Sequence, residues 1–317
     1  MEEFKFKCIR NFLMPGGVMA LFTYDFAFVG GDTRFIYMAE FLDHKGYKII
    51  IYAPSDGKGL PDCPRAESLE EAVSQARTII GGIPFTSGNM SIRHTGKKED
   101  MTTTKLLSVL KENQILFAGC LKQSFIKECA DKNVMCFDFM ADDKVTIYNT
   151  IATAEGAIAE AVMCYPDNIH GSKSLVIGYG KCGKSLAERL KGLYSETTVC
   201  TRSTVDREWA RANGHKTISF ETLGDKIGEY HLIFNTVPKM ILDKKLLYAA
   251  NSNSIILDIA SAPGGVDYKV AKKLGMNARL YPSLPGKYAP KASGNILGYY
   301  VISTISQMPQ SNKLRGI

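Results

Sequence analysis

Apolar and polar residues alternate along this chain in blocks. From residue 23 onward, short apolar runs rich in Val, Ile, Phe and Tyr are separated by longer amphipathic segments. This alternation is typical of βαβ units, in which parallel strands form a sheet and helices cover both of its faces. The pattern predicts an α/β fold with two doubly wound parallel-sheet domains.

Each half of the chain contributes its own set of strands. The predicted strands of the first half cover residues 24–30, 47–53, 77–83, 114–119 and 134–139. Those of the second half cover residues 174–180, 197–203, 216–220, 231–237, 254–260 and 278–283. Between the strands we expect helices, for example one that begins after Ser68 as N-cap and one that ends at Gly46.

The restart of the alternation after residue 170 divides the chain. We predict an N-terminal extension (1–20), a flavodoxin- or Rossmann-like substrate domain (21–145), a connecting helix (146–168), a dinucleotide-binding domain (169–288) and a C-terminal helix that returns to the first domain (289–317). Met14 or Met19 could be an alternative start. Residues 84–103 are polar, and their few hydrophobic positions follow neither a helical nor a strand periodicity, so a lid, a substrate loop or a disordered insertion is expected there.

Composition narrows the class of protein. Hydrophobic residues make up 45% and charged residues 22% of the 317 residues, with a mean hydropathy of −0.07, which is typical of a soluble globular protein. No apolar run reaches the roughly 18 residues of a membrane span. The net charge of +7 is spread among acidic residues, without the Lys/Arg stripe and aromatic residues typical of nucleic-acid binding. We therefore expect a cytoplasmic protein that binds neither membranes nor nucleic acid.

The eight cysteines predict no metal site. They form no CxxC pair and have no His at ligand spacing. Several lie in apolar runs, where a reduced cysteine behaves as a small hydrophobic residue. Buried thiols in a reducing cytosol are the expectation.

A glycine-rich turn follows the first strand of the second half. Gly178, Gly180 and Gly183 form a GxGxxG motif between an apolar strand and an amphipathic helix. The first glycine allows the tight turn, the second lets the backbone approach a pyrophosphate, and the third lets helix and strand pack closely. The helix N-terminus offers free N–H groups to the phosphates. We predict a Rossmann NAD(P)-binding domain whose cofactor contacts Gly178, Tyr179, Gly180, Lys181, Cys182 and Gly183.

The next strand bears on the choice of cofactor. An Asp or Glu at its end would bind the 2′-hydroxyl of NAD, but this chain has Thr201, Arg202 and Ser203 there. An arginine flanked by hydroxyls can pair with a 2′-phosphate. NADP is therefore preferred over NAD, although Arg202 could instead stack on the adenine from the surface.

Two further strand ends face the same edge of the predicted sheet. Because ligands bind at the carboxyl ends of strands in doubly wound sheets, both loops are expected to border the nicotinamide. The residues concerned are Asn235, Thr236, Val237, Pro238, Asp258 and Ala260. Asp258 could equally cap the turn that follows it.

Five segments together resemble one known family. They are IYNTIATAEGAIAEA, IHGSKSLVIGYGKCGKSLA, FNTVPKMILD, LDIASAPGGVD and PSLPGKYAPKASGNIL, supported by FVGGDTR near the N-terminus. In this order and spacing the chain resembles the A subunit of dipicolinate synthase from spore-forming bacteria. The resemblance covers roughly residues 22–305, and its specific motifs lie after residue 146.

This resemblance implies an activity and a partner. It implies an NAD(P)-dependent oxidation of a dihydro- or hydroxytetrahydro-dipicolinate to dipicolinate, in the mother cell during sporulation, together with the flavoprotein-like B subunit of dipicolinate synthase. A homo-oligomer is also possible. The architecture is similar to that of 2-hydroxyacid and alanine dehydrogenases, with a cleft between two domains, but the Arg/Glu/His pattern of the hydroxyacid enzymes is absent. The alternatives are an NADP-dependent dehydrogenase of another small carboxylate and a non-catalytic dinucleotide sensor.

A ring dicarboxylate as substrate would require anion-binding groups on the first domain. Arg34 follows the first strand and opens a helix, so it can pair with a carboxylate, or it can be an ordinary surface residue. Thr86 and Ser87 follow another strand and could donate hydroxyl hydrogen bonds.

Proton transfer would require an acid or base. Thr153 and Glu155 lie two apart in the connecting helix, where Glu155 could act as base or could be a solvated carboxylate. Lys291 and Ser293 lie at the start of the returning helix. Lys291 is the preferred residue for proton transfer or carboxylate binding, since desolvation could lower the pKa of a lysine, and a surface position is its alternative.

Overall fold

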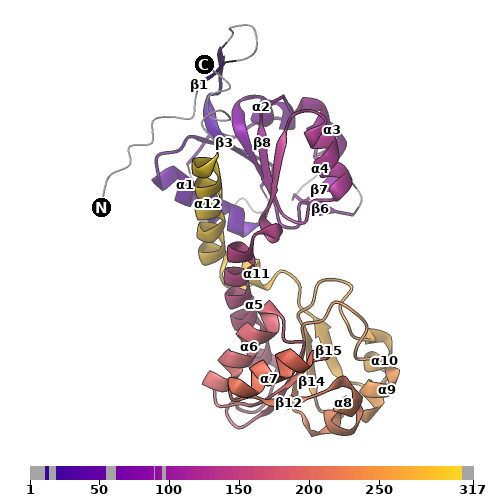
Figure 1. Cartoon of the computed structure of the whole chain (residues 1–317). Coiled ribbons are helices and arrows are strands. Elements are labelled where there is room, and N and C mark those ends of the chain that lie inside the picture. Colours follow the sequence, from indigo (N-terminus) through magenta and orange to yellow (C-terminus); the bar gives the residue numbers. More distant parts are fainter. Residues whose placement is uncertain (1–10, 14–18, 55–61, 89, 95–97, 309–317) are drawn as a thin grey trace, which may run out of the picture. The chain divides into compact units, whose positions relative to one another are not determined.

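The chain divides into two compact units. The computed structural model describes residues 11–13, 19–54, 62–88, 90–94 and 98–308 (Figure 1). Unit 1 comprises residues 1–146 together with 290–317, and unit 2 comprises residues 147–289. Among the described residues, no helix is long and apolar enough to cross a membrane.

Unit 1 is built on a five-stranded parallel sheet. Its strands lie in the order β4-β3-β5-β8-β9, which is the 2-1-3-4-5 order of flavodoxin-like folds. Their bounds are β3 (Tyr24–Val29), β4 (Ile49–Tyr52), β5 (Ala76–Gly81), β8 (Ile115–Ala118) and β9 (Met135–Asp138). Each coincides with a strand predicted from the sequence.

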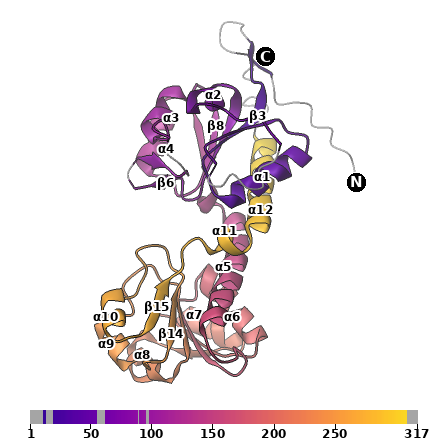
Figure 2. The same ribbon diagram turned by 180° about the vertical axis from the view of Figure 1, so that it is seen from behind.

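Helices cover both faces of this sheet. One face carries α1 (Thr33–His44) and α12 (Pro290–Gln307), and the other carries α2 (Leu69–Ser74), α3 (Thr103–Val109) and α4 (Gln123–Ala130) (Figures 1 and 2). The two faces enclose separate hydrophobic cores, as expected for strands buried on both sides. The C-terminal helix α12 packs closely on α1, because a side chain at Gly294 or Gly298 would collide with Arg34 or Phe41.

Residues 84–103 were expected to be a lid, a substrate loop or a disordered insertion. Their described residues include two short antiparallel strands, β6 (Thr86–Ser87) and β7 (Ser91–Ile92), and α3 begins at Thr103. Phe85, Ile92 and Met101 are buried in the core beneath α2 to α4. Three isolated apolar residues anchor the segment, but they are too few to produce a periodic pattern.

The predicted N-terminal extension lies mostly outside the described residues. Within it, β1 (Asn11–Leu13) pairs antiparallel with β2 (Met19–Leu21).

Unit 2 contains a six-stranded parallel sheet in the order β12-β11-β10-β13-β14-β15. This is the 3-2-1-4-5-6 order of the Rossmann fold, whose direction of winding reverses between the first and fourth strands. The strands are β10 (Lys173–Ile177), β11 (Glu196–Cys200), β12 (Lys216–Ile218), β13 (Leu232–Asn235), β14 (Ile255–Asp258) and β15 (Asn277–Leu280). The doubly wound α/β fold predicted from the sequence is confirmed in both units.

The helices of unit 2 also lie on both faces of its sheet. On one side are most of α5 (Asp143–Cys164), then α6 (Lys181–Gly192), α7 (Thr204–Ala212) and α11 (Leu284–Tyr288). On the other side are α8 (Phe220–Lys226), α9 (Lys244–Ala249) and α10 (Tyr268–Lys273). A short 3-10 helix, η2 (Ile227–Glu229), follows α8, and another, η1 (Phe139–Ala141), follows β9 in unit 1.

Candidate functional site

The GxGxxG turn lies at the winding reversal of the unit 2 sheet, between β10 and β13. Gly178 has a φ of +95°, which favours glycine, and a Cβ atom there would collide with Thr236. A Cβ atom on Gly183 would collide with the carbonyl oxygen of Gly178. Packing inside the protein therefore requires glycine at these two positions.

Gly180 is different, because no protein atom requires it to be glycine. A Cβ atom built on Gly180 would meet nothing within 4 Å, so it would project into open space. Gly180 is also the N-cap of α6, and no side chain caps that helix. The start of α6 therefore has no side-chain cap and has open space beside Gly180, as a pyrophosphate site requires. The turn fits a dinucleotide.

The neighbours of these glycines contribute in different ways. Tyr179 is only 3% exposed and packs in the core against His215, and burial raises the pKa of its phenol. Any contact of Tyr179 with a cofactor must therefore come from its backbone. Lys181 is exposed, and Cys182 is half-buried with the pKa of its thiol raised by burial.

The loop after β11 is well ordered by hydrogen bonds. Ser203 caps α7 by accepting from the backbone N–H of Asp206 at 3.1 Å, Thr201 is buried and Arg202 is exposed. Arg207, in the first two turns of α7, donates through Nη1 to the carbonyl oxygens of Thr201 at 2.8 Å and Arg202 at 3.0 Å. A second guanidinium thus lies beside the loop that holds Arg202.

Arg207 was missed in the sequence analysis. Arg207 lies four residues after the N-cap Ser203, and this spacing was a usable signal. Residues four apart lie on the same face of a helix, so the Arg207 side chain can reach the loop before the helix.

The ends of β13 and β14 are joined by a buried polar network. Asp258 is fully buried and accepts hydrogen bonds from Asn235 Nδ2 (2.9 Å), the N–H of Ala260 (3.1 Å), the N–H of Gly265 (2.6 Å) and the hydroxyl of Tyr268 (2.7 Å). Burial, and then the hydrogen bond to Asp258, raise the pKa of Tyr268. Of the two roles considered for Asp258, the structure shows the capping of the following turn.

The other residues predicted at this edge surround the glycine-rich turn. The hydroxyl of Thr236 donates to the carbonyl of Ile177 at 2.9 Å, the N–H of Val237 donates to Asn235 Oδ1 at 3.1 Å, and Pro238 is exposed. Thr236 therefore closes the turn from the side of β13.

In unit 1, Arg34 is not a surface residue. It is 4% exposed, and its guanidinium donates to both carboxylate oxygens of Asp32 (2.9 and 2.6 Å) and to the carbonyl of Ile83 (2.6 Å). The expectation of an ordinary surface position is wrong, because Asp32, the N-cap of α1, draws the side chain inward. Arg34 therefore braces the ends of β3 and β5.

The predicted acid–base residues have contrasting surroundings. Glu155 is exposed and lies 3.6 Å from Arg189 Nε, which favours a solvated ion pair over a general base. Thr153 is buried and donates to the carbonyl of Asn149 at 2.9 Å within its own helix. Lys291 is exposed at the start of α12, and Ser293 is 7% exposed in the same helix.

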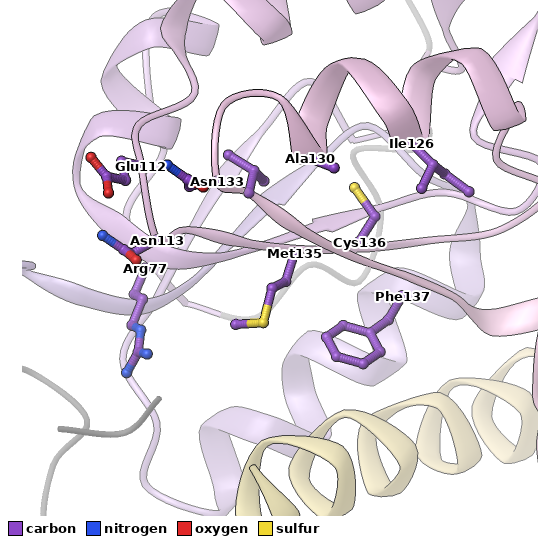
Figure 3. Close-up of a pocket in the computed structure, with 10 residues that line it drawn as sticks. Arg77, Glu112, Asn113, Ile126, Ala130, Asn133, Met135, Cys136 and Phe137 are labelled. Atoms are coloured by element: carbon purple, nitrogen blue, oxygen red, sulfur yellow. The ribbon is translucent and has the colours of Figure 1, made fainter. Parts of the chain in front are cut away.

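Among the described residues of unit 1, cavities open at opposite edges of its sheet. One, of about 210 Å³, lies near the carboxyl ends of the strands and includes Thr86 and Cys120, whereas Ser87 is exposed on the hairpin and does not line it. The other, of about 660 Å³, lies near the amino ends, between Arg77, Asn113 and the edge strand β9 (Figure 3). Despite its larger volume, the second cavity lies away from the edge where ligands bind in doubly wound sheets.

The two parallel sheets and the glycine-rich turn define a two-domain α/β fold that is also found in dehydrogenases. The structure of L-alanine dehydrogenase is similar with a TM-score of 0.58, covering 90% of this chain and 91% of that one at 12% identity.

Closer similarity points to one family. Residues 25–140 match the family model described as the N-terminal domain of the dipicolinate synthase A subunit. The dipicolinate synthase A subunit of Bacillus subtilis (strain 168) is 28% identical over 286 residues, covering 89% of this chain and 96% of the relative. The crystal structure of the dipicolinate synthase A subunit from Bacillus halodurans is similar with a TM-score of 0.80, at 23% identity, covering 90% of this chain and 98% of that one. The resemblance to this subunit of dipicolinate synthase predicted from the sequence is confirmed.

Proposed function

We propose that this chain is an NAD(P)-dependent oxidoreductase that forms dipicolinate from a dihydro- or hydroxytetrahydro-dipicolinate. The observation that carries the proposal is the open space at Gly180, beside the uncapped N-terminus of α6 and at the winding reversal of a Rossmann sheet. The name and coverage of the Bacillus subtilis relative supply the substrate class.

NADP is the preferred cofactor. Arg202 is exposed at the end of β11, and Arg207 holds the carbonyl groups of Thr201 and of Arg202 itself. No carboxylate occupies residues 201–205, and Asp206 lies 3.9 Å from Lys184 Nζ, which offsets its charge. A 2′-phosphate would meet more positive than negative charge here.

Aromatisation of the substrate ring requires loss of a hydride and a proton. When bound, the nicotinamide would supply the hydride acceptor. We propose that Lys291, exposed at the start of α12, receives the proton or binds a carboxylate, with the buried Ser293 beside it. Arg34, held by Asp32, is proposed to order the loop at the end of β3 next to the substrate.

A second kind of subunit is part of this proposal, because the relatives are named as one subunit of a synthase. The expected partner is the flavoprotein-like B subunit, in the cytoplasm of the sporulating mother cell. Activity that depends on mixing the two chains would support it.

Cofactor binding and product formation provide the test. Calorimetry should give a lower dissociation constant for NADP than for NAD, and Arg202→Ser should remove that difference, while Arg211→Ser on the exposed side of α7 should not. With substrate and the B subunit present, the ultraviolet absorbance of the pyridine product should increase. Absence of binding by either cofactor would refute the proposal.

A dehydrogenase for another small carboxylate is the second candidate, favoured by the similarity to L-alanine dehydrogenase over most of both chains. Turnover of an amino or hydroxy acid, without formation of a pyridine, would identify it. Cofactor binding with no turnover of any carboxylate would indicate a dinucleotide sensor.

A further inference from the structure

The larger cavity of unit 1 reaches a pair of cysteines. It has a volume of about 660 Å³, and Cys136 of β9 lines it together with Ile126 and Ala130 of α4. Figure 3 shows the sulfur of Cys136 directed toward α4, near Ala130. A small molecule in the cavity can therefore approach the thiol of Cys136.

Cys129 is the second member of the pair. It lies in the last turn of α4, is fully buried, and belongs to the hydrophobic core against which Cys136 packs. Met135 and Phe137, on either side of Cys136 in the strand, pack against the core on the opposite face of the sheet. Because side chains alternate along a strand, Cys136 points to the α4 side, where Cys129 lies.

The two thiols interact directly. A hydrogen bond between them lowers the pKa of Cys129 and raises the pKa of Cys136. The thiolate of the pair is therefore favoured on Cys129, with Cys136 as the donor of the hydrogen bond.

The backbone keeps the pair in place. The carbonyl of Cys129 accepts the N–H groups of Lys132 at 3.0 Å and of Val134 at 2.9 Å, which fixes the turn from α4 into β9. Val134 lies two residues before Cys136 and belongs to the same core as Cys129. The thiols are thus neighbours without any rearrangement of the chain.

We propose that Cys129 and Cys136 form a modification site, at which a small disulfide that enters the cavity converts the two thiols into an intramolecular disulfide. Disulfides that form where thiols are kept reduced are usually transient and redox-sensing. Both cysteines lie in unit 1 and the glycine-rich turn lies in unit 2, so the inference does not rest on the proposed function.

The reaction proceeds by two thiol–disulfide exchanges. In the first, Cys136 Sγ loses its proton and attacks the small disulfide, whose S–S bond breaks and releases one thiol. In the second, Cys129 Sγ attacks the sulfur of Cys136 and displaces the other half as a second thiol. Two electrons and two protons pass from the pair to the small disulfide. The raised pKa of Cys136 makes the first exchange the slow one, so the mixed disulfide should not accumulate.

Oxidised glutathione, added to the reduced full chain, tests the proposal. Trypsin cleaves after lysine, so it separates Cys129 (residues 128–132) from Cys136 (residues 133–144). After alkylation of the remaining thiols, mass spectrometry should find these two peptides joined, and reduced glutathione should separate them again. Absence of joined peptides at any excess of oxidised glutathione, or a link that reduced glutathione does not reverse, would overturn the site.

Cys129→Ser distinguishes exchange within the pair from oxidation of a single thiol. The variant keeps the accessible Cys136, so it should accumulate the mixed disulfide of residues 133–144 with glutathione. Cys63→Ser is the matched control, because Cys63 is also half-buried but packs against the core on the opposite face of the sheet. It should form the joined peptides as the wild type does. Equal accumulation of the mixed disulfide at Cys136 in the wild type and in Cys129→Ser would overturn the proposal.

A trivalent arsenical tests the pair without any substitution. Phenylarsine oxide bridges two thiols with release of water only when both sulfurs are within its reach. Added to the reduced, folded wild type, it should join residues 128–132 to residues 133–144 through one phenylarsenic group. Absence of that bridge, with the circular dichroism of the folded chain unchanged, would show that the two sulfurs do not act together and would overturn the site.

Discussion

Asn235 Nδ2 donates a 2.9 Å hydrogen bond to Asp258 Oδ1, and this bond joins the carboxyl ends of two adjacent strands, where the two residues are directly paired. Both residues are fully buried. The same carboxylate accepts from Gly265 and Tyr268, so this pair fixes the loops that follow β13 and β14.

Asn235→Leu should destabilise the protein by about 2–4 kcal/mol, because it leaves a buried carboxylate short of one donor. Urea unfolding followed by circular dichroism measures the change. Asn253→Leu, at an exposed position, should change the free energy of unfolding by less than about 0.5 kcal/mol. Equal effects of the two substitutions would contradict the importance of the network.

Gly180→Ala should affect cofactor binding, whereas Gly183→Ala should affect stability. The first should leave the melting temperature unchanged and weaken NADP binding at least tenfold, because its methyl group enters the open space where a pyrophosphate would approach. The second should cost about 1–3 kcal/mol of stability, because its methyl group collides with the Gly178 carbonyl.

Gly192→Ala, at the end of the same helix, is the control for these two variants. A Cβ atom there also meets nothing within 4 Å, but the position lies far from the turn, so cofactor affinity should not change. If Gly180→Ala bound NADP as tightly as the control, the phosphate site would have to be sought elsewhere.

The Glu160–Lys287 ion pair should make stability depend on pH in the acid range. Burial alone would raise the pKa of Glu160, but hydrogen bonds from Lys287 and Tyr288 and the charge of Lys287 lower it below the ordinary 4.5. A depressed pKa means that the stabilisation is complete above about pH 4.5 and is lost as the pH falls through the folded-state pKa.

Glu160→Gln should therefore lower the melting temperature slightly at pH 7 and progressively less below pH 4.5. The free energies of unfolding of the variant and the wild-type protein should differ by no more than about 1 kcal/mol, because the Lys287 side chain is largely exposed. Thermal unfolding of both proteins at several pH values measures it. A difference that grew as the pH fell would contradict the ion pair.

Lys291→Met should abolish turnover while leaving the dissociation constant for NADP unchanged. Loss of a proton-transfer group typically costs about 100-fold or more in rate. Lys245→Met, on the exposed side of α9, is the matched control and should remain active. A Lys291→Met variant with the wild-type rate would remove Lys291 from the chemistry.

The sequence predicted the elements of the sheets better than the surroundings of single side chains. The strands of both parallel sheets were located, because runs such as IIIY and LVI are buried on both faces and their composition alone marks them. The glycine-rich turn was located for a similar reason, since its chemistry lies in the backbone of consecutive residues. The short strands β6 and β7 were missed, because isolated buried residues do not produce a periodic hydrophobic pattern in the sequence.

The order of residues within short segments of the sequence thus determined the strand pattern, the GxGxxG turn and the family resemblance. Tertiary structure alone decided the rest, because partners distant in sequence set the environment of a side chain. Arg34 is buried only because Asp32 and the distant carbonyl of Ile83 hold it, and Asp258 caps its loop because Asn235 and Tyr268 meet it there. Thr86 and Cys120 lie far apart in the sequence, and only folding brings them to the same cavity.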